Sequence, residues 1–295
     1  MRFGLFLSQA NKSIERVLED VATAEALGFD HAWLVDHLVD TDGPPQHPIH
    51  ECWTLMAALA RHTSRIRLGT LVTSLTFHHP AVLLKQAVTV DHLSGGRLIL
   101  GLGSGWHEDE HRRYGIDLPA PRERVDRFEE ALDVITRLMA APDGELVTYH
   151  GRHYRLDEAP LAPRPVQQPR IPILVAAHRP RMLRLAARYA DQWDTFATIA
   201  GTATEGVDDG IEARVAALDA ACRAVGRDPA TLRRSTWATA DALESVEAYR
   251  AFAERHHALG FTDLVTVLPR PARLGVLRQV AEEVIPELRA AWGTA

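Results

Sequence analysis

Short apolar runs alternate with amphipathic helical stretches from one end of this chain to the other, and this alternation constrains the fold most. Within the 295 residues we expect strands near 2–7, 32–35, 66–72, 97–100, 171–176, 193–197, 233–239 and 264–268. Each is followed by a helical stretch, which is typical of βα units in a parallel sheet. Eight consecutive units favour a closed (β/α)8 TIM barrel, although an open doubly wound sheet would give a similar pattern. In such a barrel the loops after the strands carry the active site.

One long stretch between the fourth and fifth strands interrupts the regular alternation. It contains a helical pattern over about 121–139 and a small hairpin pattern, 147–149 and 154–156, around Gly151. We interpret this stretch as an insertion after the fourth strand and not as a second domain, because barrels of about 250 residues commonly carry insertions. Residues 1–295 are therefore expected to form a single domain.

The composition narrows the classes of ligand. With 33 Lys and Arg against 39 Asp and Glu, the chain has no basic excess to follow the phosphates of a nucleic acid. Its two cysteines, Cys52 and Cys222, are too few for a disulfide framework. No stretch reaches the roughly 18 apolar residues of a membrane span, and no signal-peptide pattern follows Met1. We expect a cytoplasmic protein that acts on a small molecule and binds neither nucleic acid nor membrane.

Polar residues follow the second and third predicted strands. Asp36 and His37 come after the second strand, where a carboxylate beside an imidazole can position a proton or bind a polar ring edge. Alternatively, Asp36 caps the next segment and His37 is an ordinary polar residue. Thr73 and Ser74 come after the third strand, and their hydroxyls either bind a phosphate or close the strand by local hydrogen bonds.

A run of alternating glycines, GLGSGW at 101–106, follows the fourth predicted strand. Glycines let backbone N–H groups approach a ligand closely, and the alternative is a tight turn. The run lacks the GxGxxG spacing of a dinucleotide-binding fold and the GxxxxGK[ST] spacing of a P-loop.

The next five residues, HEDEH at 107–111, match the HExxH signature of zinc proteases. A zinc helix needs an apolar face to seat it, but this polar run continues into Arg112 and Arg113 without one, and no third ligand stands at a recognised spacing. We interpret 107–111 as the solvated start of a helix, and we expect no metal to be bound there.

A series of motifs along the chain resembles one known family. They are GFD at 28–30 with Trp33 and Asp36-His37, RIRLGT at 65–70 with HPA at 79–81, DHLSGGR at 91–97 running into 101–106, YGI at 114–116, GRHY at 151–154, PRP at 163–165 and LAARYAD at 185–191. Together they resemble the bacterial luciferase-like barrel oxidoreductases, which use FMN or the deazaflavin F420. The resemblance covers most of 1–197 and, more loosely, 259–261.

The resemblance implies a homodimer of barrels, each with a flavin-type ring across the C-terminal mouth. The ring often lies over a non-prolyl cis peptide at the end of the third strand, which maps here to about Leu71-Val72. Further cofactor contacts are implied by the same comparison for Asp36, His37, Thr73, Gly103 and Ser104.

Two positions depart from the family pattern. The loop after the fifth strand usually carries a glycine-rich phosphate cradle, but this chain has Ala176, Ala177, His178 and Arg179 there. Arg179 could bind a phosphate as a fork of charged donors, whereas the alanines would strain a cradle that needs positive φ. Some F420-using members also carry a catalytic glutamate where this chain has Trp106. His37 and, less directly, Glu51 remain as proton donors.

These observations lead to one functional hypothesis with two alternatives. We expect an F420-dependent oxidoreductase that transfers a hydride between the reduced deazaflavin and a small organic substrate, because ECWT at 51–54 resembles F420-assigned members. The alternatives are an FMN-dependent luciferase-like monooxygenase and a non-catalytic barrel that binds a flavin or another ligand. Loops 38–50 and 198–210 are expected to form much of the pocket rim, and their residues identify no substrate.

Overall fold

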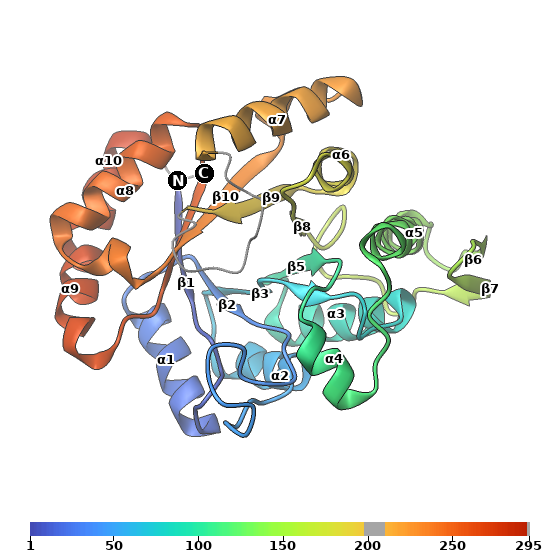
Figure 1. Ribbon diagram of the computed structural model, residues 1–295, viewed down its shortest axis with the longest axis horizontal. Helices are drawn as coiled ribbons and strands as arrows, with labels where there is room; N and C mark the ends of the chain where they lie inside the picture. Colours follow the sequence, from blue (N-terminus) through green and yellow to red (C-terminus); the bar gives the residue numbers. More distant parts are fainter. Residues whose placement is uncertain (198–209, 294–295) are drawn as a thin grey trace.

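The computed structural model describes residues 1–197 and 210–293. Within them, eight parallel strands form a closed barrel (Figure 1), in which β3 pairs with both β2 and β5, and β11 pairs with both β10 and β1. In order around the barrel the strands are β1 (Arg2–Phe6), β2 (His31–Leu34), β3 (Arg67–Thr70), β5 (Leu98–Gly103), β8 (Ile173–Ala176), β9 (Gln192–Phe196), β10 (Arg233–Ala238) and β11 (Asp263–Val267). The structure therefore confirms the predicted (β/α)8 barrel and its strands to within a few residues.

Helices surround the barrel and cover its outer face (Figure 1). They are α1 (Ile14–Ala26), α2 (Cys52–His62), α3 (Pro80–Ser94), α5 (Pro121–Ala140), α6 (Pro180–Tyr189), α7 (Ile211–Ala224), α8 (Val246–Ala258), α9 (Leu274–Gln279), η4 (Val280–Val284) and α10 (Ile285–Trp292), with the short helices η1 (Pro229–Thr231), η2 (Ala240–Leu243) and η3 (Pro271–Arg273). Local signals set several of their ends: Ser13 caps α1 by accepting a hydrogen bond from the Arg16 N–H, and Gly95, at φ 67°, ends α3. None of the helices in the described ranges is long and apolar enough to cross a membrane.

The stretch between β5 and β8 contains α4 (Glu108–Tyr114), α5 and an antiparallel hairpin of β6 (Leu146–His150) and β7 (Arg155–Pro160). The hairpin is the predicted one. The helix that we assigned to the insertion, α5, instead packs between α3 and α6 in the ring of barrel helices. The insertion in the described structure therefore consists of α4 and the hairpin.

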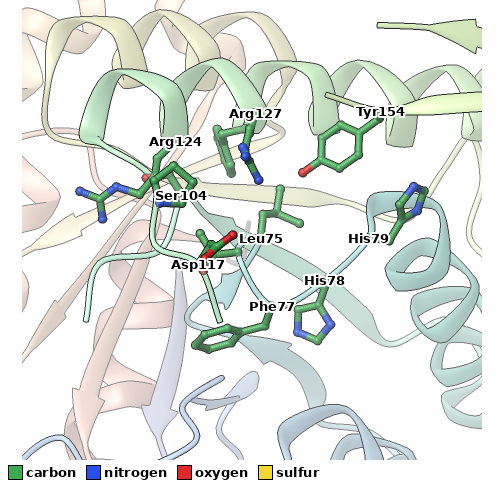
Figure 2. A pocket seen from close by; sticks show the side chains of 12 residues that line it. Leu75, Phe77, His78, His79, Ser104, Asp117, Arg124, Arg127 and Tyr154 are labelled. Atoms are coloured by element: carbon green, nitrogen blue, oxygen red, sulfur yellow. The ribbon is translucent and has the colours of Figure 1, made fainter. Parts of the chain in front are cut away.

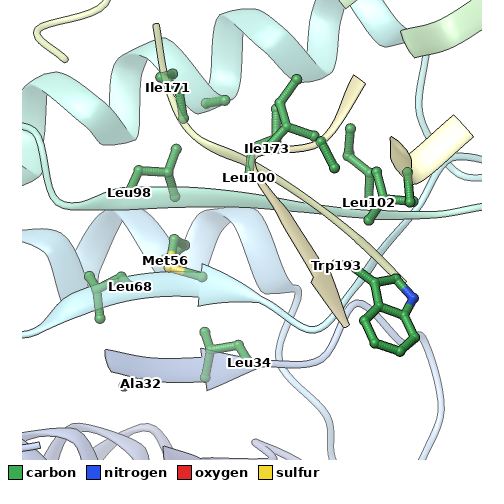
Figure 3. Packing of buried hydrophobic residues seen from close by; sticks show 14 of the residues in the cluster. Ala32, Leu34, Met56, Leu68, Leu98, Leu100, Leu102, Ile171, Ile173 and Trp193 are labelled. Carbon is green, nitrogen blue, oxygen red and sulfur yellow. The ribbon is translucent and has the colours of Figure 1, made fainter. Parts of the chain in front are cut away.

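The apolar core has two parts because strand side chains alternate between the two faces of the barrel wall. Ala32 and Leu34 point outward into the large cluster between strands and helices (Figure 3). Trp33 points inward and forms a small cluster with Ile99, Leu174 and Val265. Gly69 provides the space for Trp33, since a Cβ on Gly69 would lie 2.3 Å from the indole ring.

Several polar side chains at the N-terminal end of the barrel form a hydrogen-bonded chain. The Trp33 Nε1–H donates to His31 Nδ1 at 2.8 Å, and His31 Nε2 lies 3.1 Å from Asp263 Oδ1, which Arg233 also contacts. Burial alone would raise the pKa of Asp263. The His31 hydrogen bond and the Arg233 charge outweigh this and lower the pKa below its usual value, so this carboxylate stays ionised. This end contributes to stability, as is usual for the fold.

Candidate functional site

The parallel strands place four of the predicted site segments at one mouth of the barrel. Asp36 follows β2, Leu71 follows β3, Gly103 ends β5 and Ala176 ends β8. Because parallel strands in a barrel end at the same edge, these residues lie around one opening. Of the predicted rim, residues 198–209 lie outside the described residues.

The chain makes a bulge after β3, and the Leu71–Val72 peptide bond is cis. After it, the short strand β4 (Thr73–Ser74) pairs with the end of β5. Gly103 makes this approach possible, because a Cβ there would lie 2.6 Å from Val72 Cγ2. Leu71 and Val72 are half-buried on the inner cluster and leave apolar surface at the mouth.

The glycine run and Thr73 differ from their predicted roles. The run is neither a turn nor an open loop up to Gly103: it extends β5, and the Gly103 carbonyl accepts a hydrogen bond from the Leu75 N–H at 3.0 Å. Thr73 is fully buried, and its hydroxyl donates to Thr70 Oγ1 at 2.9 Å. The Thr73 hydroxyl is therefore not available to a cofactor. Ser104 lies just beyond β5 and is partly exposed.

His37 pairs with a carboxylate that the sequence did not single out. Its Nδ1 lies 2.9 Å from Glu110 Oε1, and Glu110 Oε2 accepts the Leu38 N–H at 2.9 Å. A carboxylate only accepts, so Nδ1 carries a proton and Nε2 is left to exchange one. The Glu110 side chain is 2% exposed. Burial raises the pKa of Glu110, but hydrogen bonding and charge from His37 outweigh it and keep the carboxylate ionised.

Asp36 connects the bulge to a second histidine. Its Oδ2 accepts hydrogen bonds from the Ser74 N–H and from His78 Nε2, each at 2.9 Å. The side chain is only 4% exposed. Asp36 therefore holds the backbone just after the cis peptide in place, and this positioning role goes beyond the cofactor contact that the resemblance implied.

Glu51 caps a helix. Its two carboxylate oxygens accept the N–H groups of Trp53 and Thr54 at 2.9 and 2.6 Å, at the start of α2. Partial burial raises the pKa of Glu51, but the hydrogen bonds from Thr54 and Trp53 outweigh this and lower it. A carboxylate that stays ionised and is used for capping is unsuited to donate a proton, so the structure does not support the prediction that Glu51 is a proton donor.

The HExxH segment, residues 107–111, provides the N-cap and the first residues of α4. We interpreted it as the solvent-exposed start of a helix, and this is wrong for two of its residues. Glu110 and His111 are each 1% exposed. His111 Nδ1 donates to the His107 carbonyl at 2.7 Å, while its Nε2 lies 2.7 Å from Thr76 Oγ1. Polar partners, not an apolar face, seat this helix. Across residues 1–197 and 210–293, no three His, Cys, Asp or Glu side chains are grouped to hold a metal ion.

Trp106 precedes this helix and is 55% exposed at the mouth. Its ring meets the His37 ring edge-on, with centroids 5.9 Å apart and planes at 89°, and it meets the His107 ring at 4.9 Å. The position at which some family members carry a glutamate therefore presents an apolar surface beside His37.

The opposite side of the mouth is aromatic. Phe6 stacks on Trp237 with centroids 5.6 Å apart, Trp237 meets Phe196 edge-on at 4.9 Å, and Phe196 stacks on His178 at 4.8 Å. Burial, with Arg214 and Arg179 nearby, lowers the pKa of His178 to about 4, so this imidazole is neutral at pH 7. All four rings are partly exposed.

The loop after β8 retains one candidate for phosphate binding. Ala176 ends β8 and is partly exposed, whereas Ala177 is buried, donates its N–H to the Asp194 carbonyl at 3.3 Å, and accepts from Trp193 Nε1 at 2.8 Å. Arg179 is the exposed N-cap residue of α6, and its guanidinium forms no hydrogen bond or ion pair within the described residues. The charge of Arg179 and the first-turn N–H groups of α6 can together attract an anion. The buried and hydrogen-bonded backbone of Ala177 cannot.

Comparisons with known proteins agree with this architecture. The chain is 34% identical over 233 residues to the F420-dependent hydroxymycolic acid dehydrogenase of Mycobacterium tuberculosis, covering 78% of this chain and 59% of the relative. It is 40% identical over 156 residues to limonene 1,2-monooxygenase of Rhodococcus erythropolis, covering 50% of this chain and 37% of the relative. The chain thus spans less than two thirds of the length of these curated relatives.

A solved structure shares the whole fold. The F420-dependent secondary alcohol dehydrogenase in complex with an F420-acetone adduct superposes with a TM-score of 0.81 at 19% identity, covering 98% of this chain and 99% of the other. The sequence model of the luciferase-like monooxygenases matches residues 1–294. The chain therefore belongs to the luciferase-like monooxygenase family.

Proposed function

We propose that this chain is an F420-dependent oxidoreductase that transfers a hydride between the reduced deazaflavin and a small organic substrate. The observation that carries the proposal is the mouth itself, which combines an apolar bulge at Leu71 and Val72, the His37–Glu110 pair and a wall of aromatic rings. Support for F420 comes from relatives and structural neighbours whose names state that dependence.

The mouth residues fit a flat ring system. Leu71 and Val72 present half-buried apolar surface, and Phe6, Phe196 and Trp237 add partly exposed aromatic faces. Such surfaces bind a planar heterocycle by burial and stacking. Arg179 and the start of α6 are the groups that would hold the phosphate of the cofactor.

When bound, the reduced cofactor supplies the hydride. The protein then has to supply a proton to the oxygen of a carbonyl substrate, and His37 is the group that we assign to this role. Glu110 orients the imidazole through Nδ1 and offsets its positive charge, because the carboxylate is ionised and only 2% exposed. In the oxidation of an alcohol, the same Nε2 would accept the proton.

An FMN-dependent monooxygenase is the second candidate, favoured by the identity to limonene 1,2-monooxygenase over half of this chain. Fluorescence titration with F420 and with FMN, followed by anaerobic and aerobic turnover of a panel of ketones, separates the readings. Tight F420 binding with anaerobic ketone reduction supports the first proposal. FMN binding with oxygen-dependent turnover supports the second, and binding without turnover supports a non-catalytic barrel.

By family resemblance we also propose that the protein is a cytoplasmic homodimer. Light scattering behind size-exclusion chromatography tests the dimer, because a mass near the 32.7 kDa of one chain would contradict it.

A further inference from the structure

A pocket of about 290 Å³ lies beside the barrel mouth and outside the barrel wall (Figure 2). The loop after β4, the N-terminal half of α5 and the turn of the β6–β7 hairpin enclose it. Leu75, Phe77 and Phe128 provide its apolar surface. The volume is near the lower limit of small-ligand sites, so it fits a molecule of about one ring. The proposed reaction makes no use of this pocket.

Two hydrogen-bond donors face the pocket from different elements. Arg127 comes from α5 and Tyr154 from the hairpin turn, and Figure 2 shows the Tyr154 hydroxyl directed towards the Arg127 guanidinium. The Tyr154 hydroxyl has no hydrogen-bond partner among the described residues. Burial raises the pKa of Tyr154, and although Arg127 opposes this, the phenol keeps its proton and can donate it.

Arg127 has donors to spare. Among the described residues, its guanidinium hydrogen-bonds only to Glu123 Oε1, one turn earlier on α5, through Nε at 3.1 Å and Nη2 at 2.8 Å. The two side chains are 43% and 41% exposed, and such exposed pairs contribute only about 0–1 kcal/mol. A ligand anion can therefore compete with Glu123 or share the guanidinium with it.

The far end of the pocket carries side chains of both charges. Asp117 lines it there, near Ser104 and Arg124, and Figure 2 shows Asp117 apart from Tyr154 and His79. Arg124 is held by the Gly105 carbonyl at 2.8 Å, and its buried Nε has no partner among the described residues. The Asp117 carboxylate offsets the charge of the Arg124 guanidinium at this end, so a bound anion is directed to Arg127 and Tyr154, where no carboxylate lines the pocket.

We propose that this pocket is a binding site for a small carboxylic acid or phosphate ester with an apolar body. The anionic group contacts Arg127 and the Tyr154 hydroxyl, and the body packs on Leu75, Phe77 and Phe128. The site is distinct from the mouth that we assign to the cofactor, although His78 and Ser104 border both.

Calorimetric titration of the full chain without cofactor tests the proposal with phenyl phosphate, benzoate, inorganic phosphate and benzyl alcohol. We expect phenyl phosphate to bind at least tenfold more tightly than inorganic phosphate, and more tightly than neutral benzyl alcohol. The phenyl phosphate and benzoate arms distinguish a phosphate ester from a carboxylate as the preferred group. Arg127→Gln should weaken phenyl phosphate at least tenfold, since it removes a charged hydrogen bond, and Tyr154→Phe about two- to tenfold.

A matched control lies on the same helix. Arg137 pairs with Asp133 at i, i+4 as Arg127 pairs with Glu123, but it does not line the pocket, so Arg137→Gln should leave binding unchanged. Equal losses in the two arginine variants, or equal affinities for phenyl phosphate and inorganic phosphate, would overturn the proposal. Full competition between phenyl phosphate and F420 would also overturn it, because the probe would then occupy the cofactor site. These readouts involve no turnover, so failure of the proposed oxidoreductase activity leaves them intact.

Discussion

Replacing Glu110 with glutamine tests how much the negative charge of Glu110 contributes to proton transfer by His37. The exchange keeps the shape of a side chain that accepts from His37 Nδ1 and from the Leu38 N–H, each at 2.9 Å. The amide oxygen can still accept one of these bonds. The negative charge that stabilises a protonated imidazole in this nearly closed site is lost, because the Glu110 side chain is only 2% exposed.

The size of the effect follows from the bond that is weakened. A hydrogen bond to a charged group contributes about 1.5–3 kcal/mol, which corresponds to a fall in the reduction rate of roughly 10- to 150-fold. Cofactor affinity should change little, since Glu110 acts through His37.

The assay is anaerobic single-turnover reduction of a ketone from pH 5 to 9, with cofactor affinity measured by fluorescence in parallel. Glu108→Gln is the matched control, since Glu108 is exposed on the same helix two residues earlier. An unchanged rate in Glu110→Gln, with the thermal midpoint retained, would refute the assignment of His37 and Glu110 as a proton-transfer unit. A loss of cofactor binding instead of rate would also contradict it.

Other variants test the binding of the cofactor phosphate by Arg179, the packing of Gly103 on the bulge after β3, and the effect of His178 on stability at acid pH. Arg179→Ala should weaken cofactor binding by about 1.5–3 kcal/mol, or roughly tenfold to hundredfold, with a smaller effect in high salt, and unchanged affinity in fluorescence titration would remove Arg179 from the site. Gly103→Ala places a Cβ 2.6 Å from Val72 Cγ2 and should cost about 1–3 kcal/mol in denaturant unfolding. Gly275→Ala, with nothing within 4 Å, should instead stabilise helix α9 by about 0.5–1 kcal/mol, and equal effects would contradict the contact. Burial lowers the pKa of His178 to about 4 from 6.5, so the unfolded state binds more protons and stability falls as the pH drops from about 6.5 through 4. His178→Phe should reduce that loss, and equal acid sensitivity of variant and wild type in urea titrations would show otherwise.

Local pattern was sufficient to predict the eight βα units, and it favoured a closed barrel over an open sheet. Most strands of the barrel contain apolar residues that pack outward on helices, as Ala32 and Leu34 do, or inward, as Trp33 does. These preferences act over a few residues and are visible in any single sequence. Family resemblance added the place of the bulge, since the cis bond is found at Leu71–Val72.

The same local view did not show what several site residues contact within the chain. Glu51 was taken as a proton donor, but it precedes Trp53 and Thr54 at a helix start, where capping uses both of its oxygens. Gly103 was expected to contact the cofactor through its backbone, and the structure gives it a further role, because it leaves space for Val72, a residue 31 positions earlier. A residue type alone does not reveal whether its partner is a ligand or another part of the chain.

The sequence by itself determined the eight βα units and the strand ends that the candidate site residues follow, because periodicity and turn residues act locally. Only the tertiary structure decided which polar groups meet. His37 hydrogen-bonds to Glu110, which lies 73 positions away in the sequence, and Asp36 hydrogen-bonds to His78, which lies 42 positions away. The HEDEH segment carries no apolar periodicity, so nothing in its pattern marked Glu110 as buried. It is the closure of the barrel that brings the ends of β2 and β5 together and encloses that carboxylate beside an imidazole.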